Sequence, residues 1–350
     1  MNYKTKIMAT MGPTLVEVEQ LVKAIKMEVS YFRLHLGSRE RDVCQYIQNV
    51  EEAKKISREK VSILLDLPSS RPRVAELPYQ ELVVGSEYLV TSDIMPQNDN
   101  SIPIPGIDKL LSYLKIGERL LFRDGKIVLE ILKIDTYNRN LTAICRTCNT
   151  RIGRGCSCVM PDSDVSYDSI VEDDINVFEQ MKKRGQFPDY ICISFASSVE
   201  QVNKVKEIIS HYWPRDKVRF IVKVENRFGV NRYKELLGVS DGIMIGRGDL
   251  ALHIDPTLVP IIQEKICKYS NEHKKECIIG TEFFENFATT GVISRPELTD
   301  VACAIKQNAS AIMLSMESAN SKYPFETLEM VSSIICNINK YSNSDVVIEK

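Results

Sequence analysis

The sequence contains no apolar run of about 18 residues, the length that a membrane-spanning helix requires. Its first residues, Met1 to Lys6, do not open the apolar stretch of a secretory signal peptide. A basic excess is also missing, because 45 Lys and Arg stand against 47 Asp and Glu, a formal net charge of −2. General nucleic-acid binders usually carry such an excess. We therefore expect a cytoplasmic protein that binds neither membranes nor nucleic acids.

Cysteine is not scarce, with ten residues in a chain of 350. In a long chain without a secretory leader, they are best interpreted as reduced cytosolic thiols. The hydrophobic fraction of 44% and the charged fraction of 26% are those of an ordinary globular protein. At roughly 150 residues per domain, the length predicts two domains.

Short apolar segments alternate along much of the chain with amphipathic segments of helical period. One of them, residues 61–66, is a continuous apolar run that ends in a carboxylate, as is typical of a strand buried on both faces of a parallel sheet. Eight such strand and helix pairs predict a (β/α)₈ TIM barrel, with an open doubly wound sheet as the alternative. The predicted strands are residues 6–10, 30–34, 61–66, 190–193, 218–224, 242–245, 277–279 and 311–314.

The alternation stops between residues 74 and 161, where strand-like patterns of period 2 replace it. Asp124-Gly125 is a hairpin signal between two of these patterns. We therefore predict an α/β protein in which residues 1–73 and 162–350 form the barrel. Residues 74–161 form a small all-β lid domain inserted after the third strand. Without this insert, the chain has close to the roughly 250 residues of a single barrel.

Polar side chains follow most of the predicted strands, and catalytic residues of a TIM barrel lie at the C-terminal strand ends. Glu225 and Asp249 are hard oxygen donors of the kind that Mg²⁺ prefers. Basic residues such as Lys223 could neutralise phosphate oxygens during phosphoryl transfer. The chain has no Walker A sequence, no kinase HRD and DFG pair and no G-x-G-x-x-G, so a phosphate site here needs another design. The polar residues at these ends are Arg33, His35, Asp66, Arg71, Arg73, Lys223, Glu225, Asp249, Thr281, Glu282, Ser315 and Glu317.

Seven short motifs lie along the barrel segments. They are TKIMATMGP (5–13), FRL (32–34), VKVEN (222–226), SDGIMIGRGDL (240–250), TDVA (299–302), IMLSMESA (312–319) and YP (323–324). In this order and spacing, they make the sequence resemble the pyruvate kinase family over almost its whole length. The resemblance implies the same barrel fold, and the all-β insert stands where that family has its mobile lid.

The resemblance also implies Mg²⁺-dependent phosphoryl transfer between phosphoenolpyruvate and ADP through an enolpyruvate intermediate. The substrates would be phosphoenolpyruvate or pyruvate with ADP or ATP, and Mn²⁺ could replace Mg²⁺. By motif position, Glu225 and Asp249 would bind the metal and Lys223 would stabilise the transferred phosphoryl group. Gly248 and Thr281 would hold the substrate carboxylate, and Asp249 and Lys223 would also line the substrate site.

The remaining implied contacts concern phosphates and proton delivery. Arg33 would contact substrate and nucleotide phosphates, and Arg73 and His35 would contact the nucleotide. Ser315 would lie with Thr281 near the path of proton delivery, although the end of the eighth strand could instead be purely structural.

The sequence departs from the family at the potassium site. That site uses an Asn and a Ser after the arginine of the second strand and an Asp-Thr pair that ends the third, where this chain has His35, Gly37 and Asp66-Leu67. Arg71 stands where potassium-dependent members carry a Glu, and potassium-independent members are similar in pairing Leu with a basic residue. We expect the Arg71 guanidinium to supply the charge of the ion, so that K⁺ is not required. The alternative is a decayed site with an exposed Arg71.

Four cysteines lie close together in the insert, as a C-x-x-C (Cys145, Cys148) followed by a C-x-C (Cys156, Cys158). Four thiolates so spaced could hold a structural Zn²⁺ tetrahedrally. The gap between the two pairs is shorter than in common zinc ribbons, so reduced thiols or an incidental cluster are the alternatives.

Three functions therefore stay open. The first is a compact pyruvate kinase-type phosphotransferase, expected to lack the family's C-terminal α/β domain because the chain stops after the eighth helix. The second is an enzyme of the same superfamily that uses phosphoenolpyruvate, pyruvate or a nucleotide with a changed acceptor in a biosynthetic pathway. The third is a non-catalytic binding or sensor protein. The oligomeric state is also open, with a homodimer through the barrel as one candidate.

Overall fold

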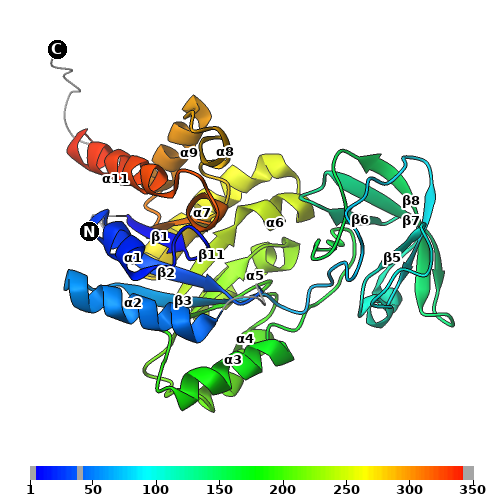
Figure 1. The fold of residues 1–350 in the computed structure, drawn as a ribbon, viewed down its shortest axis with the longest axis horizontal. Helices are drawn as coiled ribbons and strands as arrows, with labels where there is room; N and C mark the ends of the chain where they lie inside the picture. The colour runs from blue at the N-terminus through cyan, green and yellow to red at the C-terminus, as the bar shows by residue number, and fades with distance from the viewer. Residues whose placement is uncertain (1–4, 38–41, 342–350) are drawn as a thin grey trace. The chain divides into compact units, whose positions relative to one another are not determined.

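The computed structural model describes residues 5–37 and 42–341 of the chain (Figure 1). Among these residues, no helix combines the length and the apolar character that crossing a membrane would require. The described residues divide into two compact units, which we treat separately. The barrel unit takes its residues from 1–69, 169–247 and 257–350, and the insert unit consists of residues 70–168 and 248–256.

Eight parallel strands of the barrel unit form a closed barrel in the order β1-β13-β12-β11-β10-β9-β3-β2. The first and last strands close it, with Lys6 of β1 opposite Ala311 of β13. This confirms the predicted (β/α)₈ barrel and excludes the open sheet. The strands are β1 (Lys6–Thr10), β2 (Val29–His35), β3 (Ser62–Leu67), β9 (Tyr190–Ile193), β10 (Arg219–Val224), β11 (Gly242–Gly246), β12 (Glu276–Gly280) and β13 (Ala311–Leu314).

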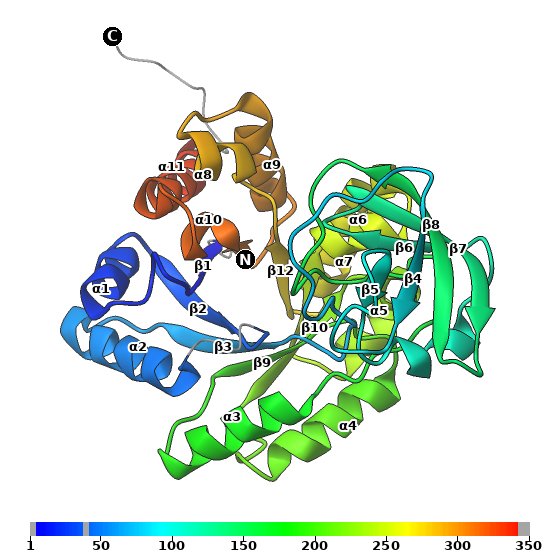
Figure 2. The same ribbon diagram turned by 45° about the vertical axis from the view of Figure 1, so that its right-hand side comes forward.

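Helices cover the outside of the barrel, which is clearest in Figure 2. Because the strands are buried on both faces, they are almost entirely apolar, and side chains such as Met8, Leu64 and Met244 fill the interior. The helices are α1 (Val18–Lys26), α2 (Val43–Ser57), α3 (Glu172–Lys183), α4 (Val199–Ser210), α5 (Arg227–Gly238), α7 (Val259–Glu272), α8 (Glu285–Thr290), α9 (Arg295–Lys306), α10 (Met316–Ala319) and α11 (Pro324–Tyr341). Helix α6 (Arg247–His253) begins in the barrel unit and continues in the insert unit.

The insert unit contains a five-stranded sheet in the order β5-β4-β8-β7-β6. Its strands are β4 (Glu87–Thr91), β5 (Ser101–Pro103), β6 (Arg119–Phe122), β7 (Ile127–Asp135) and β8 (Asn140–Cys148). The predicted hairpin turn is present, with positive φ angles at Arg123, Asp124 and Gly125 between β6 and β7. This sheet, which follows β3 along the chain, confirms an all-β insert after the third barrel strand. The boundaries at 74 and 161 stay a prediction.

Candidate active site

A buried cluster of charged side chains gathers in the barrel unit around Asp66, which lies near the C-terminal end of β3 and is fully buried. Arg33 of β2 donates to Asp66 Oδ2 through Nε (2.7 Å), and its Nη2 lies 2.6 Å from the same oxygen. The third guanidinium nitrogen, Nη1, donates to Thr10 Oγ1 at the end of β1 (3.0 Å). The guanidinium is therefore fixed from two neighbouring strands.

Lys223 of β10 completes this cluster. Its ammonium nitrogen lies 3.4 Å from Asp66 Oδ2, 3.0 Å from Ser194 Oγ and 2.9 Å from Glu225 Oε1. The second carboxylate oxygen of Glu225 accepts the backbone N–H of Phe195 at 2.9 Å. Lys223 and Glu225 are two residues apart at the end of one strand and point the same way, as strand geometry requires. The Lys223 ammonium thus lies between two carboxylates.

The charges of the cluster hold one another ionised. Burial works to raise the pKa of Asp66, but Lys223, Arg33 and His35 outweigh it, and the pKa lies well below its usual range. Burial works to lower the pKa of Lys223, but Asp66 and Glu225 hold it above its usual range. Buried ions persist only when they are paired in this way. The cluster therefore presents a fixed ammonium group at the strand ends.

The carboxylate of Glu225 depends on the absence of a side chain on the neighbouring strand β11. A Cβ atom added to Gly246 would lie 2.7 Å from both Cγ and Oε1 of Glu225. Since real Cβ contacts essentially never fall below 3.0 Å, only glycine at position 246 leaves the carboxylate in place.

The two residues directly after β12 have unusual backbone conformations. Thr281 and Glu282 both have positive φ angles, 73° and 60°, and such angles are rare for a β-branched residue. The buried carboxylate of Glu317 accepts backbone N–H groups from Phe283 (3.1 Å) and Ser315 (2.7 Å). Glu317 therefore ties the two loops together and has a structural role, and Ser315 lies directly beside it.

Arg247, the first residue of α6, fixes the same loop. Its Nη2 donates to the carbonyl oxygen of Thr281 (2.6 Å), its Nε to that of Gly280 (3.3 Å), and its Nη1 to Asp300 (2.7 Å). The guanidinium also lies over the ring of Phe283, 4.1 Å from its centroid. Thr281 is thus anchored through its main chain.

Two of the positions that the resemblance assigns to a potassium site, Gly37 and Leu67, carry no hydroxyl that could bind an ion. Leu67 is fully buried at the end of β3. A Cβ atom on Gly37 would lie 2.5 Å from the His35 ring, so the histidine occupies the space that a side chain at 37 would need. The imidazole is close enough to Asp66 to contribute to its low pKa.

The insert unit contains the other predicted site residues. Arg71 forms an ion pair with Asp249 through Nη1 and Oδ1, and the two side chains are 12% and 25% exposed. Gly248 belongs to the same unit and directly precedes Asp249. Arg73 donates from Nη1 to the carbonyl oxygen of Gly155 (3.3 Å).

The structure does not support the zinc site. In the described part of the chain, no three His, Cys, Asp or Glu side chains gather as a metal site would require. Cys145 and Cys148 lie on strand β8 opposite Leu129 and Ile127 of β7, and Cys148 Sγ accepts the backbone N–H of Leu82 (3.2 Å). Cys158 is completely buried, and burial raises the pKa of its thiol to about 12. These cysteines therefore act as strand and core residues of the insert unit.

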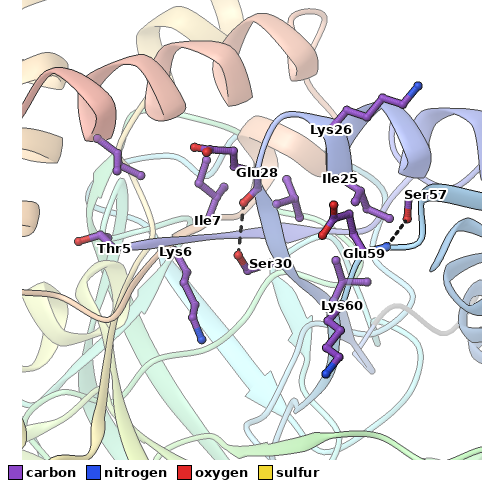
Figure 3. Close-up of a pocket in the computed structure, with 13 residues that line it drawn as sticks. Thr5, Lys6, Ile7, Ile25, Lys26, Glu28, Ser30, Ser57, Glu59 and Lys60 are labelled. Carbon is purple, nitrogen blue, oxygen red and sulfur yellow. Dashed lines mark hydrogen bonds between the residues drawn. The ribbon is translucent and has the colours of Figure 1, made fainter. Parts of the chain in front are cut away.

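A hollow of about 640 Å³ lies at the other end of the barrel strands (Figure 3). Its lining mixes apolar residues with ammonium and carboxylate groups, and Lys26 and Lys60 extend in opposite directions. The Ser30 hydroxyl is turned toward the Glu28 carbonyl (3.3 Å). Because the N-terminal ends of barrel strands serve stability and the C-terminal ends serve catalysis, the charged cluster rather than this hollow is the candidate active site.

Thr10 and Ser194 are cluster members that the sequence did not single out. Both are small hydroxyl residues at the end of a predicted strand, and neither carries a charge that would mark it. The signals that could have found them are the place of Thr10 at the end of strand 6–10, within the motif 5–13, and the place of Ser194 directly after strand 190–193.

Comparison with known proteins agrees with this geometry. Residues 2–328 match the model of the pyruvate kinase barrel domain. A pyruvate kinase of Thermotoga maritima is 30% identical over 94% of this chain and 70% of its own length. One from Dictyostelium discoideum is 31% identical over 95% and 65%. The crystal structure of a pyruvate kinase from Cryptosporidium parvum superimposes with a TM-score of 0.85 at 26% identity, covering 97% of this chain and 70% of that one. The chain thus spans roughly two thirds of these relatives, and it belongs to the pyruvate kinase family.

Proposed function

We propose that this protein transfers a phosphoryl group between phosphoenolpyruvate and ADP. The observation that supports the proposal most directly is the Lys223 ammonium, which two buried carboxylates hold ionised at the strand ends. In the forward direction, the bond between phosphorus and the enol oxygen breaks and a bond to a terminal oxygen of ADP forms. Lys223 stabilises the negative charge on the phosphoryl group as it moves.

The metal proposed for this reaction is Mg²⁺, which Mn²⁺ could replace. The chemistry of the donor set fits, because Mg²⁺ commonly takes one or two carboxylates and completes its shell with water and substrate oxygens. Glu225 and Asp249 would be these carboxylates. When bound, the ion supplies positive charge to phosphate and enolate oxygens.

The remaining residues bind the substrates and deliver the proton. We assign the substrate carboxylate to Gly248 and Thr281, and the proton path to the hydroxyl groups of Thr281 and Ser315. Phosphate contacts fall to Arg33 and Arg73. The main-chain anchoring of Thr281 supports this assignment, since a residue held against its own backbone preference is typical of a functional site.

The reaction is proposed to need no K⁺. Arg33 and Lys223 already neutralise Asp66, and Leu67 offers no hydroxyl for an ion. Arg71 is proposed to supply the positive charge that the ion supplies elsewhere in the family.

One experiment tests the proposed reaction. Purified protein is incubated with phosphoenolpyruvate, ADP and Mg²⁺, with and without K⁺, and pyruvate release is followed. We expect turnover that does not depend on K⁺. Glu225→Gln serves as the control, because the amide still accepts the Phe195 N–H but loses the charge that a metal requires. It should keep its far-UV circular dichroism and lose activity by about 10²-fold or more.

A changed acceptor is the second candidate. It is favoured by His35, whose ring fills the space beside Gly37 where the family offers a polar contact. Under this candidate, the protein binds Mn²⁺ and phosphoenolpyruvate but releases no pyruvate with ADP. The intact charged cluster speaks against a purely non-catalytic protein.

A further inference from the structure

The ion pair between Arg71 and Asp249 joins two residues to which the proposed function gives separate roles. Within the insert unit, the Arg71 guanidinium meets Oδ1 of the carboxylate that is assigned to the metal. The pair is shielded, with side chains 12% and 25% exposed. Two other arginine pairs of the same unit, Arg146 with Glu130 and Arg119 with Asp162, have side chains between 32% and 50% exposed.

The surroundings of this pair are of low polarity. Cys158 and Tyr167 are both buried, and burial is the main cause that raises the pKa of each. The positive charge of Arg71 acts in the opposite direction and lowers the pKa of both groups. An ion pair in such surroundings is screened less by water and salt than an exposed pair. The Arg71 and Asp249 pair is therefore screened less than these two pairs, and its carboxylate is one of the two proposed metal ligands.

We propose that Arg71 is a tethered competitor of the divalent metal, holding the Asp249 carboxylate until the metal takes it. This inference rests on the proposed function, which makes Asp249 a metal ligand. An oxygen that accepts from a guanidinium cannot at the same time give its full charge to Mg²⁺, and the two cations repel each other. Metal binding then releases Arg71 from its partner.

The released guanidinium has a second consequence. Its planar fork of five N–H donors suits the oxygens of a phosphate or carboxylate. An anion that binds Arg71 removes the competitor from Asp249, and the metal thus binds more tightly. By linkage, the metal must strengthen anion binding by the same factor. Arg71 would therefore couple the loading of metal and anionic substrate without any change in fold.

The test measures Mn²⁺ binding to the whole protein by electron paramagnetic resonance, without substrate. Arg71→Met should bind Mn²⁺ about tenfold more tightly than the wild type, within the range of typical coupling energies. The control, Arg146→Met, removes an exposed arginine of the same unit and should leave the Kd unchanged. Inorganic phosphate should tighten Mn²⁺ binding in the wild type and have no such effect in Arg71→Met.

Other outcomes overturn the inference. These are an Mn²⁺ Kd that is unchanged or weaker in Arg71→Met, or no Mn²⁺ binding in either protein. Mn²⁺ binding that is detected in Arg71→Met but not in the wild type supports the inference. If Arg71→Met melts at a much lower temperature, Arg71→Gln replaces it with the same expectations. Asp249→Asn, made in the wild type and in Arg71→Met, should abolish the difference in Mn²⁺ affinity between the two proteins. Loss of the proposed reaction is a separate result, since it would show as absent pyruvate release while the competition for Mn²⁺ persists.

Discussion

At the scale of single residues, the proposed site requires a residue without a side chain at position 246, which is Gly246. Gly246→Ala places a methyl group where the Glu225 carboxylate lies, and Lys223 and the Phe195 N–H hold that carboxylate in place. We expect the variant to displace Glu225, to weaken Mn²⁺ binding and to lower kcat by about 10²-fold, because a misplacement of about 1 Å has this effect. Steady-state kinetics and Mn²⁺ titration measure both.

Gly238 provides the matched control. It is the last residue of α5, and an added Cβ would meet no atom within 4 Å. Gly238→Ala should therefore keep the kinetics and the Mn²⁺ affinity of the wild type. Equal activity in Gly246→Ala would show that the Glu225 carboxylate does not need its present position.

At the scale of one element, the N-terminus of α3 carries a buried acid. Asp174 is 1% exposed, and its Oδ2 accepts the backbone N–H of Val171 (3.0 Å). Burial, more than the charges of Asp173 and Asp66, raises the pKa of Asp174 from 3.8 to about 6. Folding thus favours the protonated acid. Ionising Asp174 in the folded protein costs stability. This cost is absent below about pH 4, grows as the pH rises to 6, and is complete above that.

Asp174→Asn tests this linkage. The amide oxygen can still accept the Val171 N–H but carries no charge, so the variant should be more stable than the wild type at pH 7.5. The gain is at most about 3 kcal/mol, from 1.36 kcal/mol per pKa unit, and it should vanish near pH 3.5. Urea unfolding at the two pH values measures it. Glu172→Gln, an exposed change in the same turn, is the control. A gain that does not vary with pH would contradict the assigned titration.

The same scale shows how far the sequence predicts the fold. Three barrel strands, 6–10, 190–193 and 311–314, have the predicted bounds, because each is a compact apolar run between polar residues. Strand β5 (Ser101–Pro103) was not predicted, since three residues are too few to show an alternating pattern.

The residues of the candidate site were also predicted only in part. Charged residues at strand ends were found from the sequence because burying a strand leaves its polar residues at the ends. Their partners were not, because the hydroxyl groups of Thr10 and Ser194 come to Arg33 and Lys223 only when the barrel closes. The cysteine spacing did not lead to a metal site, because Cys145 and Cys148 lie within strand β8 and the described residues bring no three metal-ligating side chains together.

At the scale of the whole molecule, the two ends of the insert are joined to each other. The backbone N–H of Ser70 donates to the carbonyl of Asp168 (2.7 Å), and the Asp168 N–H donates to the Ser70 hydroxyl (2.8 Å). The first and last residues of the insert, Ser70 and Asp168, are therefore neighbours in space. Replacing residues 71–167 by a Gly-Gly link should close this gap with little strain.

We expect this shortened protein to keep a folded barrel, because the strand pairs of the closed barrel all lie outside the removed segment. It should unfold cooperatively in urea with a smaller m-value, in proportion to the surface that the insert no longer contributes. It should also lose activity, since Arg71 and Arg73 are gone. Replacing α4 by a Gly linker is the contrasting deletion, because it uncovers barrel strands that are buried on both faces and should abolish the cooperative transition. A shortened protein that unfolds without cooperativity would mean that the barrel needs the insert to fold.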